Sequence, residues 1–163
     1  MTRIHAYFLA ERIESLIVIA IGIVAIVCGF YFLLVINKSF SNGVSWPLLI
    51  LAIIQLTVGA YIYFKTPADE HRVMAYAKKG KKNIKNIEIP RMEIVMTKFK
   101  LYLYTEMGLI VLGLFLYLIS SPEGFWRGVG LSMVIQGGFM LLADSFAENR
   151  GQRYLDFLKS EFR

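Results

Sequence analysis

The sequence contains one cysteine and two histidines among its 163 residues. Cys28 has no second thiol with which to form an intrachain disulfide, so we expect it to be a small packing residue. His5 and His71 have no second ligand at a metal-binding spacing. A glycine-rich phosphate loop, a nucleophile elbow and a paired-carboxylate motif are also lacking. The sequence therefore predicts no metal, no cofactor and no enzymatic activity.

Charge is nearly absent from four long apolar runs, at residues 15–36, 47–64, 101–119 and 125–143. A hydrophobic content of 56% exceeds that of ordinary soluble domains. About 20 apolar residues in a helix cross about 30 Å of hydrocarbon. We therefore expect an all-α membrane protein, with one four-helix domain over residues 1–163 and four transmembrane helices.

Turn and capping signals separate these runs. Asn37–Ser45 and Ser120–Gly124 contain the residues typical of turns. Thr66-Pro67 and Ser145 resemble helix starts, each with an acidic residue three positions after the hydroxyl. The pattern predicts a new helix near the headgroups within a basic cytoplasmic segment at 66–100. It also predicts an amphipathic cytoplasmic tail at 145–163.

The basic residues predict the threading. Residues 65–100 hold ten of the eighteen Lys and Arg residues, whereas the two short connections carry only Lys38 and Arg127. Lys and Arg concentrate on the cytoplasmic side of membrane proteins. We therefore expect a multi-pass protein of the inner or plasma membrane with both termini and the central segment in the cytoplasm.

Spans two and four resemble each other. Trp46 and Trp126 open them, and Gln55 and Gln136 follow nine or ten residues later. A shift of eighty-one also aligns further pairs, among them Arg72 with Arg153 and Lys78 with Lys159. Two tandem hairpin repeats would explain this, as would the shared constraints of two hairpins in one membrane.

Three polar residues lie within the predicted spans. Gln55 and Gln136 fall near mid-membrane, where an amide must face the bundle interior. They could bond to each other and join the two spans, or form a site for an ion or small ligand. Glu106 could pair with Arg12, Lys98 or Lys100 at the inner interface, or handle protons or cations as an intramembrane carboxylate.

The basic segments offer candidate contacts for anionic lipid headgroups or for a partner protein, and nucleic acid ranks below both. These candidates are Arg72, Lys78, Lys79, Lys81, Lys82, Lys85 and Arg153.

Two functions remain open. The first is a non-enzymatic interaction or accessory protein of adaptor, assembly or immunity type, which binds a partner protein or a second copy. The second is a small oligomeric channel or transporter that uses Glu106, Gln55 and Gln136.

Overall fold

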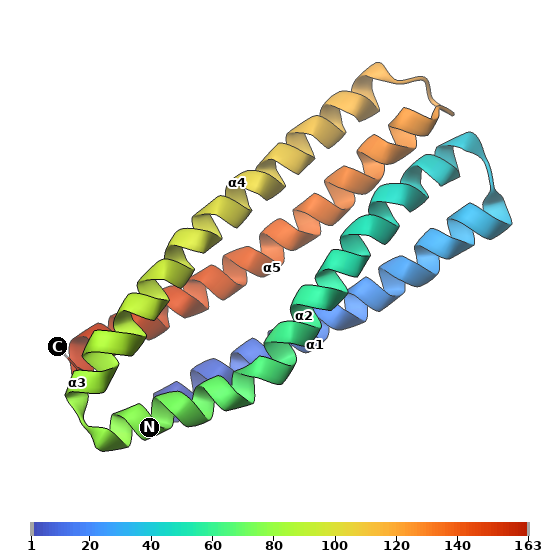
Figure 1. The fold of residues 1–163 in the computed structure, drawn as a ribbon. Helices are drawn as coiled ribbons and strands as arrows, with labels where there is room; N and C mark the ends of the chain where they lie inside the picture. Colours follow the sequence, from blue (N-terminus) through green and yellow to red (C-terminus); the bar gives the residue numbers. More distant parts are fainter. Residues whose placement is uncertain (1, 163) are drawn as a thin grey trace.

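The computed structural model describes residues 2–162 and shows an all-helical chain folded as a long bundle (Figure 1). Within the described residues, four long helices are joined by two short connections and one helical corner. The elements are α1 (Thr2–Tyr31), η1 (Phe32–Ile36), α2 (Ser39–Lys79), α3 (Lys81–Asn83), η2 (Ile84–Glu88), α4 (Ile89–Ile119) and α5 (Phe125–Glu161).

The four long helices confirm the prediction of an all-α chain with four long apolar helices. Among residues 2–162, four helices are long and apolar enough to cross a membrane, with mean hydropathies of 2.9, 1.9, 1.8 and 1.4 in their most apolar windows. Their exposed side chains are largely apolar over the predicted spans. Such a surface is typical of contact with lipid rather than with water.

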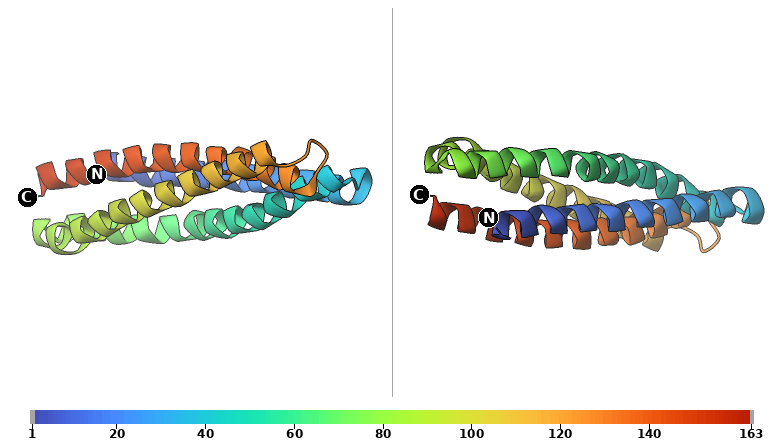
Figure 2. Two further views of the ribbon diagram at one scale, coloured as in Figure 1. Left: turned by 90° about the horizontal axis from the view of Figure 1, so that it is seen from above. Right: turned by 90° about the horizontal axis from the view of Figure 1, so that it is seen from below.

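The helices form two antiparallel hairpins, α1–α2 and α4–α5, which meet mainly where α2 packs against α5 (Figure 2). Both termini and the α3 corner lie at one end, here named the terminal end. The connections at 37–38 and 120–124 lie at the other end, here named the loop end. At the loop end the backbones of α2 and α5 approach so closely that a Cβ on Gly43 or Gly128 would overlap the opposing backbone.

The helix starts predicted at Thr66 and Ser145 are wrong. α2 runs unbroken through Pro47 and Pro67, and α5 runs unbroken through Ser145. The Thr66 hydroxyl lies 2.7 Å from the Ile62 carbonyl oxygen, and the Ser145 hydroxyl lies 2.6 Å from the Leu141 carbonyl oxygen. Both hydroxyls therefore bond back within a continuing helix instead of capping a new one.

Other boundaries agree with the sequence only in part. Gly80 ends α2 with a φ of 121°, Pro90 lies in the first turn of α4, and residues 120–124 form a turn, as expected. The predicted turn at 37–45 is limited to Asn37 and Lys38, with Asn37 left-handed at φ 44°. The basic loop expected after Gly80 is helical instead, as α3 and η2.

A buried apolar core fills the terminal end. It draws residues from all four long helices and the corner: Ile4, Tyr7, Phe8, Val73, Ile84, Met92, Met96, Tyr154, Leu155 and Leu158. The apolar faces of the segments outside the predicted spans therefore pack on one another. The segment after residue 66 is therefore a continuation of α2 packed in the bundle, and not the separate helix that the sequence predicted.

Candidate functional site

The two glutamines meet between α2 and α5. The Gln55 amide Nε2 donates to the Gln136 Oε1 over 3.2 Å, and both side chains are buried. A direct amide bond is the structural alternative that the sequence left open, in which the amides join spans two and four. Such bonds contribute about 0.6–2 kcal/mol between membrane helices.

The recesses of the bundle lie away from these amides. Among the described residues, one recess of about 290 Å³ is lined by residues such as Phe32, Val44 and Ile135, and another of about 300 Å³ by Trp46, Leu109 and others. Neither has Gln55, Gln136 or Glu106 in its lining.

Glu106 is buried on α4, with 2% of its surface exposed, and its acidic neighbour is Asp144 of α5. The expected ion pairs with Arg12, Lys98 or Lys100 are not formed. Arg12 instead donates to the Tyr63 hydroxyl over 2.8 Å, and the two lysines are exposed on α4. The second carboxylate oxygen of Glu106 has no hydrogen-bond partner among the described residues.

Glu106 and the glutamines form two separate groups. Asp144 follows Gln136 by eight residues on α5, which is about 12 Å along a helix. The structure thus joins the two amides by a hydrogen bond and places the two carboxyl groups next to each other.

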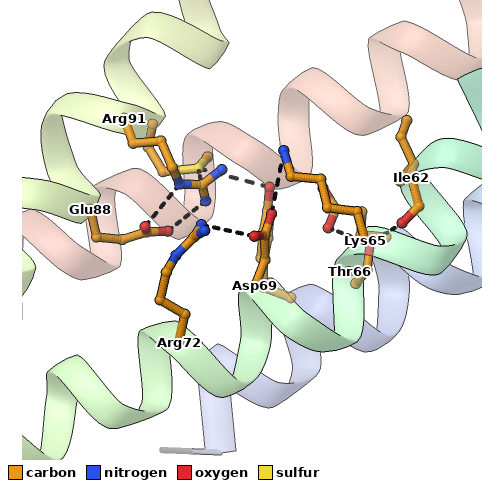
Figure 3. Close-up of polar contacts among 10 residues, drawn as sticks. Ile62, Lys65, Thr66, Asp69, Arg72, Glu88 and Arg91 are labelled. Atoms are coloured by element: carbon orange, nitrogen blue, oxygen red, sulfur yellow. Dashed lines mark hydrogen bonds and ion pairs between the residues drawn. The ribbon is translucent and has the colours of Figure 1, made fainter.

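A polar network that the sequence did not indicate lies in the terminal end (Figure 3). Glu88 is fully buried and accepts two hydrogen bonds from Arg91, at 2.8 Å from Nε and 2.6 Å from Nη2. The Tyr154 hydroxyl lies 3.4 Å from Glu88 Oε1, and the Tyr154 ring stacks on Tyr7 with centroids 4.0 Å apart. One sign of this network was visible in the sequence, the three-residue spacing between Glu88 and Arg91. The same spacing occurs on many exposed helices, so it does not indicate a buried pair.

The network continues across α1, α2 and α5. Asp69 forms ion pairs with Arg72 at 2.8 Å and with Lys65 at 3.7 Å. Arg150 of α5 forms an ion pair with Glu14 of α1 and lies over the Tyr7 ring, 5.4 Å from its centroid. The Arg150 contacts join the two hairpins by charge as well as by apolar packing, whereas the Asp69 contacts lie within α2.

Burial shifts several protonation equilibria in this network. Burial raises the pKa of the Glu11 carboxyl, and the hydrogen bond from Thr66 at 3.0 Å opposes this shift. Burial also raises the pKa of the Tyr7 hydroxyl and that of the Tyr154 hydroxyl, so both stay protonated. For Arg91, burial lowers the pKa, but the bond and charge of Glu88 outweigh it and the pKa is raised. Arg91 therefore stays protonated beside Glu88.

Four lysines at the corner between α2 and α4 lie close together in the sequence and share one environment. Lys78, Lys79, Lys82 and Lys85 are exposed, and within the described residues none forms an ion pair. The side chain of Lys81 lies outside the described part of the chain. We call residues 78–85 the lysine-rich turn.

Arg72 and Arg153 are the remaining candidates for contact with a headgroup or a partner protein. Arg153 is exposed on α5, whereas Arg72 is held by Asp69 and is less free for a headgroup or partner. His5, expected to be solvated, lies with its Nδ1 2.6 Å from Glu70 Oε1 and remains exposed. A search of the described residues finds no group of three or more metal-binding side chains.

The fold and site define a bundle of four helices that are long and apolar enough to span a membrane, with an apolar core and ion pairs at its terminal end. Comparison with protein-family models, with curated proteins and with solved structures gave no match to this chain.

Proposed function

We propose that this chain is a non-enzymatic interaction protein of the inner or plasma membrane, and that its lysine-rich turn docks an acidic surface of a partner protein in the cytoplasm. The observation that carries the proposal is the position of that turn. α2 is one continuous helix, and Lys78 lies fourteen residues beyond Phe64, where the second predicted span ends. This places the lysines about 21 Å further along the helix axis.

That distance favours a protein partner over lipid. The headgroup layer takes up about 5–8 Å of it. The remainder approaches two Debye lengths at physiological salt, where one Debye length is about 8 Å. Lysines at this distance are only weakly attracted to anionic headgroups, although the sequence alone left lipid open as their binding partner.

Charge balance in the terminal end supports the same proposal. Arg72, Arg91, Arg150 and Lys159 all form ion pairs within the chain. Their charges are therefore partly neutralised, whereas the lysines of the turn add to one another. A rigid helical extension that presents unpaired positive charge at its tip suits the capture of an acidic surface by electrostatic steering.

The first test asks whether the turn contacts lipid. The protein is reconstituted into vesicles that contain phosphatidylserine and a headgroup-attached quencher, with a fluorophore at position 82 or 65. We expect strong quenching at position 65, which borders the second span, and little at position 82. Equal quenching at the two positions would mean that the turn lies on the membrane, and would refute the proposal.

The second test measures binding of a polyglutamate peptide to the protein in neutral-lipid nanodiscs. Replacing Lys78, Lys82 and Lys85 with Gln should weaken binding severalfold more than replacing Arg3, Lys100 and Arg153 with Gln. Both variants lose three positive charges from exposed sites. Equal losses would show that net charge, rather than the turn, attracts the probe.

We infer in addition that the α1–α2 and α4–α5 hairpins are tandem repeats. The bond between Gln55 and Gln136, which occupy matching positions, supports this inference.

A small transporter or channel remains the second candidate function, and the Glu106–Asp144 pair favours it. Two neighbouring carboxyl groups repel each other when both are ionised, which favours binding of a proton, and no basic side chain among the described residues is paired with Glu106. Proton flux into liposomes would test it: flux that is abolished in Glu106→Gln but kept in Glu123→Gln, a change at the exposed loop end, supports transport. Liposomes that stay sealed with wild-type protein exclude it.

A further inference from the structure

We propose that two copies of this chain associate through α4, which presents a heptad-spaced stripe away from its own bundle. The inference is independent of the lysine-rich turn. α4 packs on the rest of the chain through a narrow face that includes Met92, Met96, Glu106 and Gly113, all buried. The opposite face of the helix is left without a partner.

The exposed face has the seven-residue period of a coiled coil. Counting Ile94 as an a position, the a positions of α4 are Ile94, Leu101, Gly108 and Phe115, and Ile87 of η2 lies seven residues before Ile94; all five are exposed. The d positions are Pro90, Thr97, Tyr104, Val111 and Leu118, and these are exposed as well. A stripe with this period is the seam along which two helices pack side by side.

Part of the stripe lies where lipid does not cover it. Ile87 is 46% exposed and Ile94 is 59% exposed, although both precede the third predicted span, which begins at residue 101. Ile87 lies about 21 Å from that boundary along the helix axis. Isoleucine side chains are unfavourable in water, and these two continue the stripe that lies inside the span. We therefore infer that another protein surface covers them.

Symmetry and charge identify the occupant as a second copy. Two copies inserted in one membrane with the same orientation are related by an axis along the membrane normal, so their α4 helices run parallel. In a parallel coiled coil, a g residue faces the e residue five positions later on the other helix. Glu93 is a g residue and Lys98 is the e residue five positions later, so each Glu93 meets Lys98 of the second copy with opposite charge.

The span contains a residue suited to close approach. A Cβ added to Gly108 would meet no atom within 4 Å, so this a position leaves space for a neighbouring helix. Small residues at such positions let membrane helices approach closely. The lysine-rich turns of the two copies would lie at the same end, but their exposed side chains can spread apart, and salt screens the repulsion.

Cysteine cross-linking in membranes tests the seam. In a Cys28→Ser background, Ile94→Cys and Ile87→Cys should each form a disulfide-linked dimer under mild oxidation, because a positions of parallel helices face each other. Gln152→Cys is the matched control: it is exposed on α5, next to Gly151, which packs against Met96. Failure of both stripe variants to cross-link, or equal cross-linking at position 152, would overturn the proposal.

Charge exchange tests the register. Glu93→Lys should weaken the dimer about two- to fivefold, the range for an exposed ion pair, in an energy-transfer assay of labelled chains diluted with lipid. The double variant Glu93→Lys/Lys98→Glu should restore it. Glu93 also pairs with Lys159 of its own chain at 2.7 Å, so Lys159→Glu is the control and should leave the dimer intact. A double variant no stronger than Glu93→Lys would refute this register.

Discussion

Glu88 and Arg91 show how single residues hold the terminal end together. Glu88 is fully buried, and Arg91 meets it with two hydrogen bonds. Removing one partner of a buried pair leaves an uncompensated charge and costs about 3–5 kcal/mol. The two residues are one turn apart on the same chain segment, so the pair brings little long-range order by itself. Tyr154 provides that order, because it links Glu88 to α5.

The burial of Glu11 predicts that the stability of the protein depends on pH. Burial raises the pKa of its carboxyl in the folded state above the ordinary value of 4.5. The folded state therefore binds this proton more tightly than the unfolded state, and the carboxyl lowers stability as pH rises from 4.5 through the folded pKa. Glu11→Gln removes this cost. We expect the variant to be more stable than wild type at pH 8, with the difference vanishing below pH 4.5.

Thermal unfolding in detergent as a function of pH measures this difference. Other carboxylates titrate over the same range, so the comparison between variant and wild type is the informative quantity. Glu123→Gln, at an exposed carboxyl in the loop, serves as control and should leave the melting temperature unchanged. A Glu11→Gln variant that is less stable than wild type at pH 8 would show that attraction to Arg150 outweighs burial.

At the scale of elements, the four apolar runs predicted four helices correctly, but local capping signals misplaced their ends. Thr66-Pro67 reads as a helix start, yet Thr66, Asp69 and Val73 are all buried on one continuing face of α2. Packing on both sides of Pro67 therefore outweighs the backbone hydrogen bond that proline removes. The glutamine contact was predictable because mid-span amides have few partners. The Glu88–Tyr154–Tyr7 contacts were not, because they join residues far apart in sequence.

Pro67→Ala tests the continuity of α2. A proline inside a helix costs about 3 kcal/mol relative to alanine, whereas a proline in the first turn costs almost nothing. If α2 is continuous, the alanine variant should be more stable by about 1–3 kcal/mol. Pro90→Ala, in the first turn of α4, is the matched control and should change stability little. If neither substitution stabilises the protein, the result would favour a helix break at residue 66. Equilibrium unfolding in mixed micelles supplies the comparison.

The whole molecule is a bundle whose two ends differ in chemistry. The loop end has Lys38 in one connection and Arg127 in the first turn of α5 as its basic residues, while the terminal end contains the ion pairs and the lysine-rich turn. An ion-paired core of this kind is built for water rather than for hydrocarbon, where each charge costs several kcal/mol. The molecule therefore divides, from one end to the other, into an apolar part and a charged extension.

The orientation of this molecule in a membrane follows from that division. Lys and Arg remain on the cytoplasmic side during insertion, so we expect the terminal end to face the cytoplasm. In a Cys28→Ser background, Lys82→Cys should react with a membrane-impermeant maleimide only after the cells are permeabilised. Lys38→Cys, exposed at the loop end, should react in intact cells. The opposite pattern would place the lysine-rich turn outside, where no cytoplasmic partner could reach it, and labelling of both positions in intact cells would mean that the chain does not span the membrane.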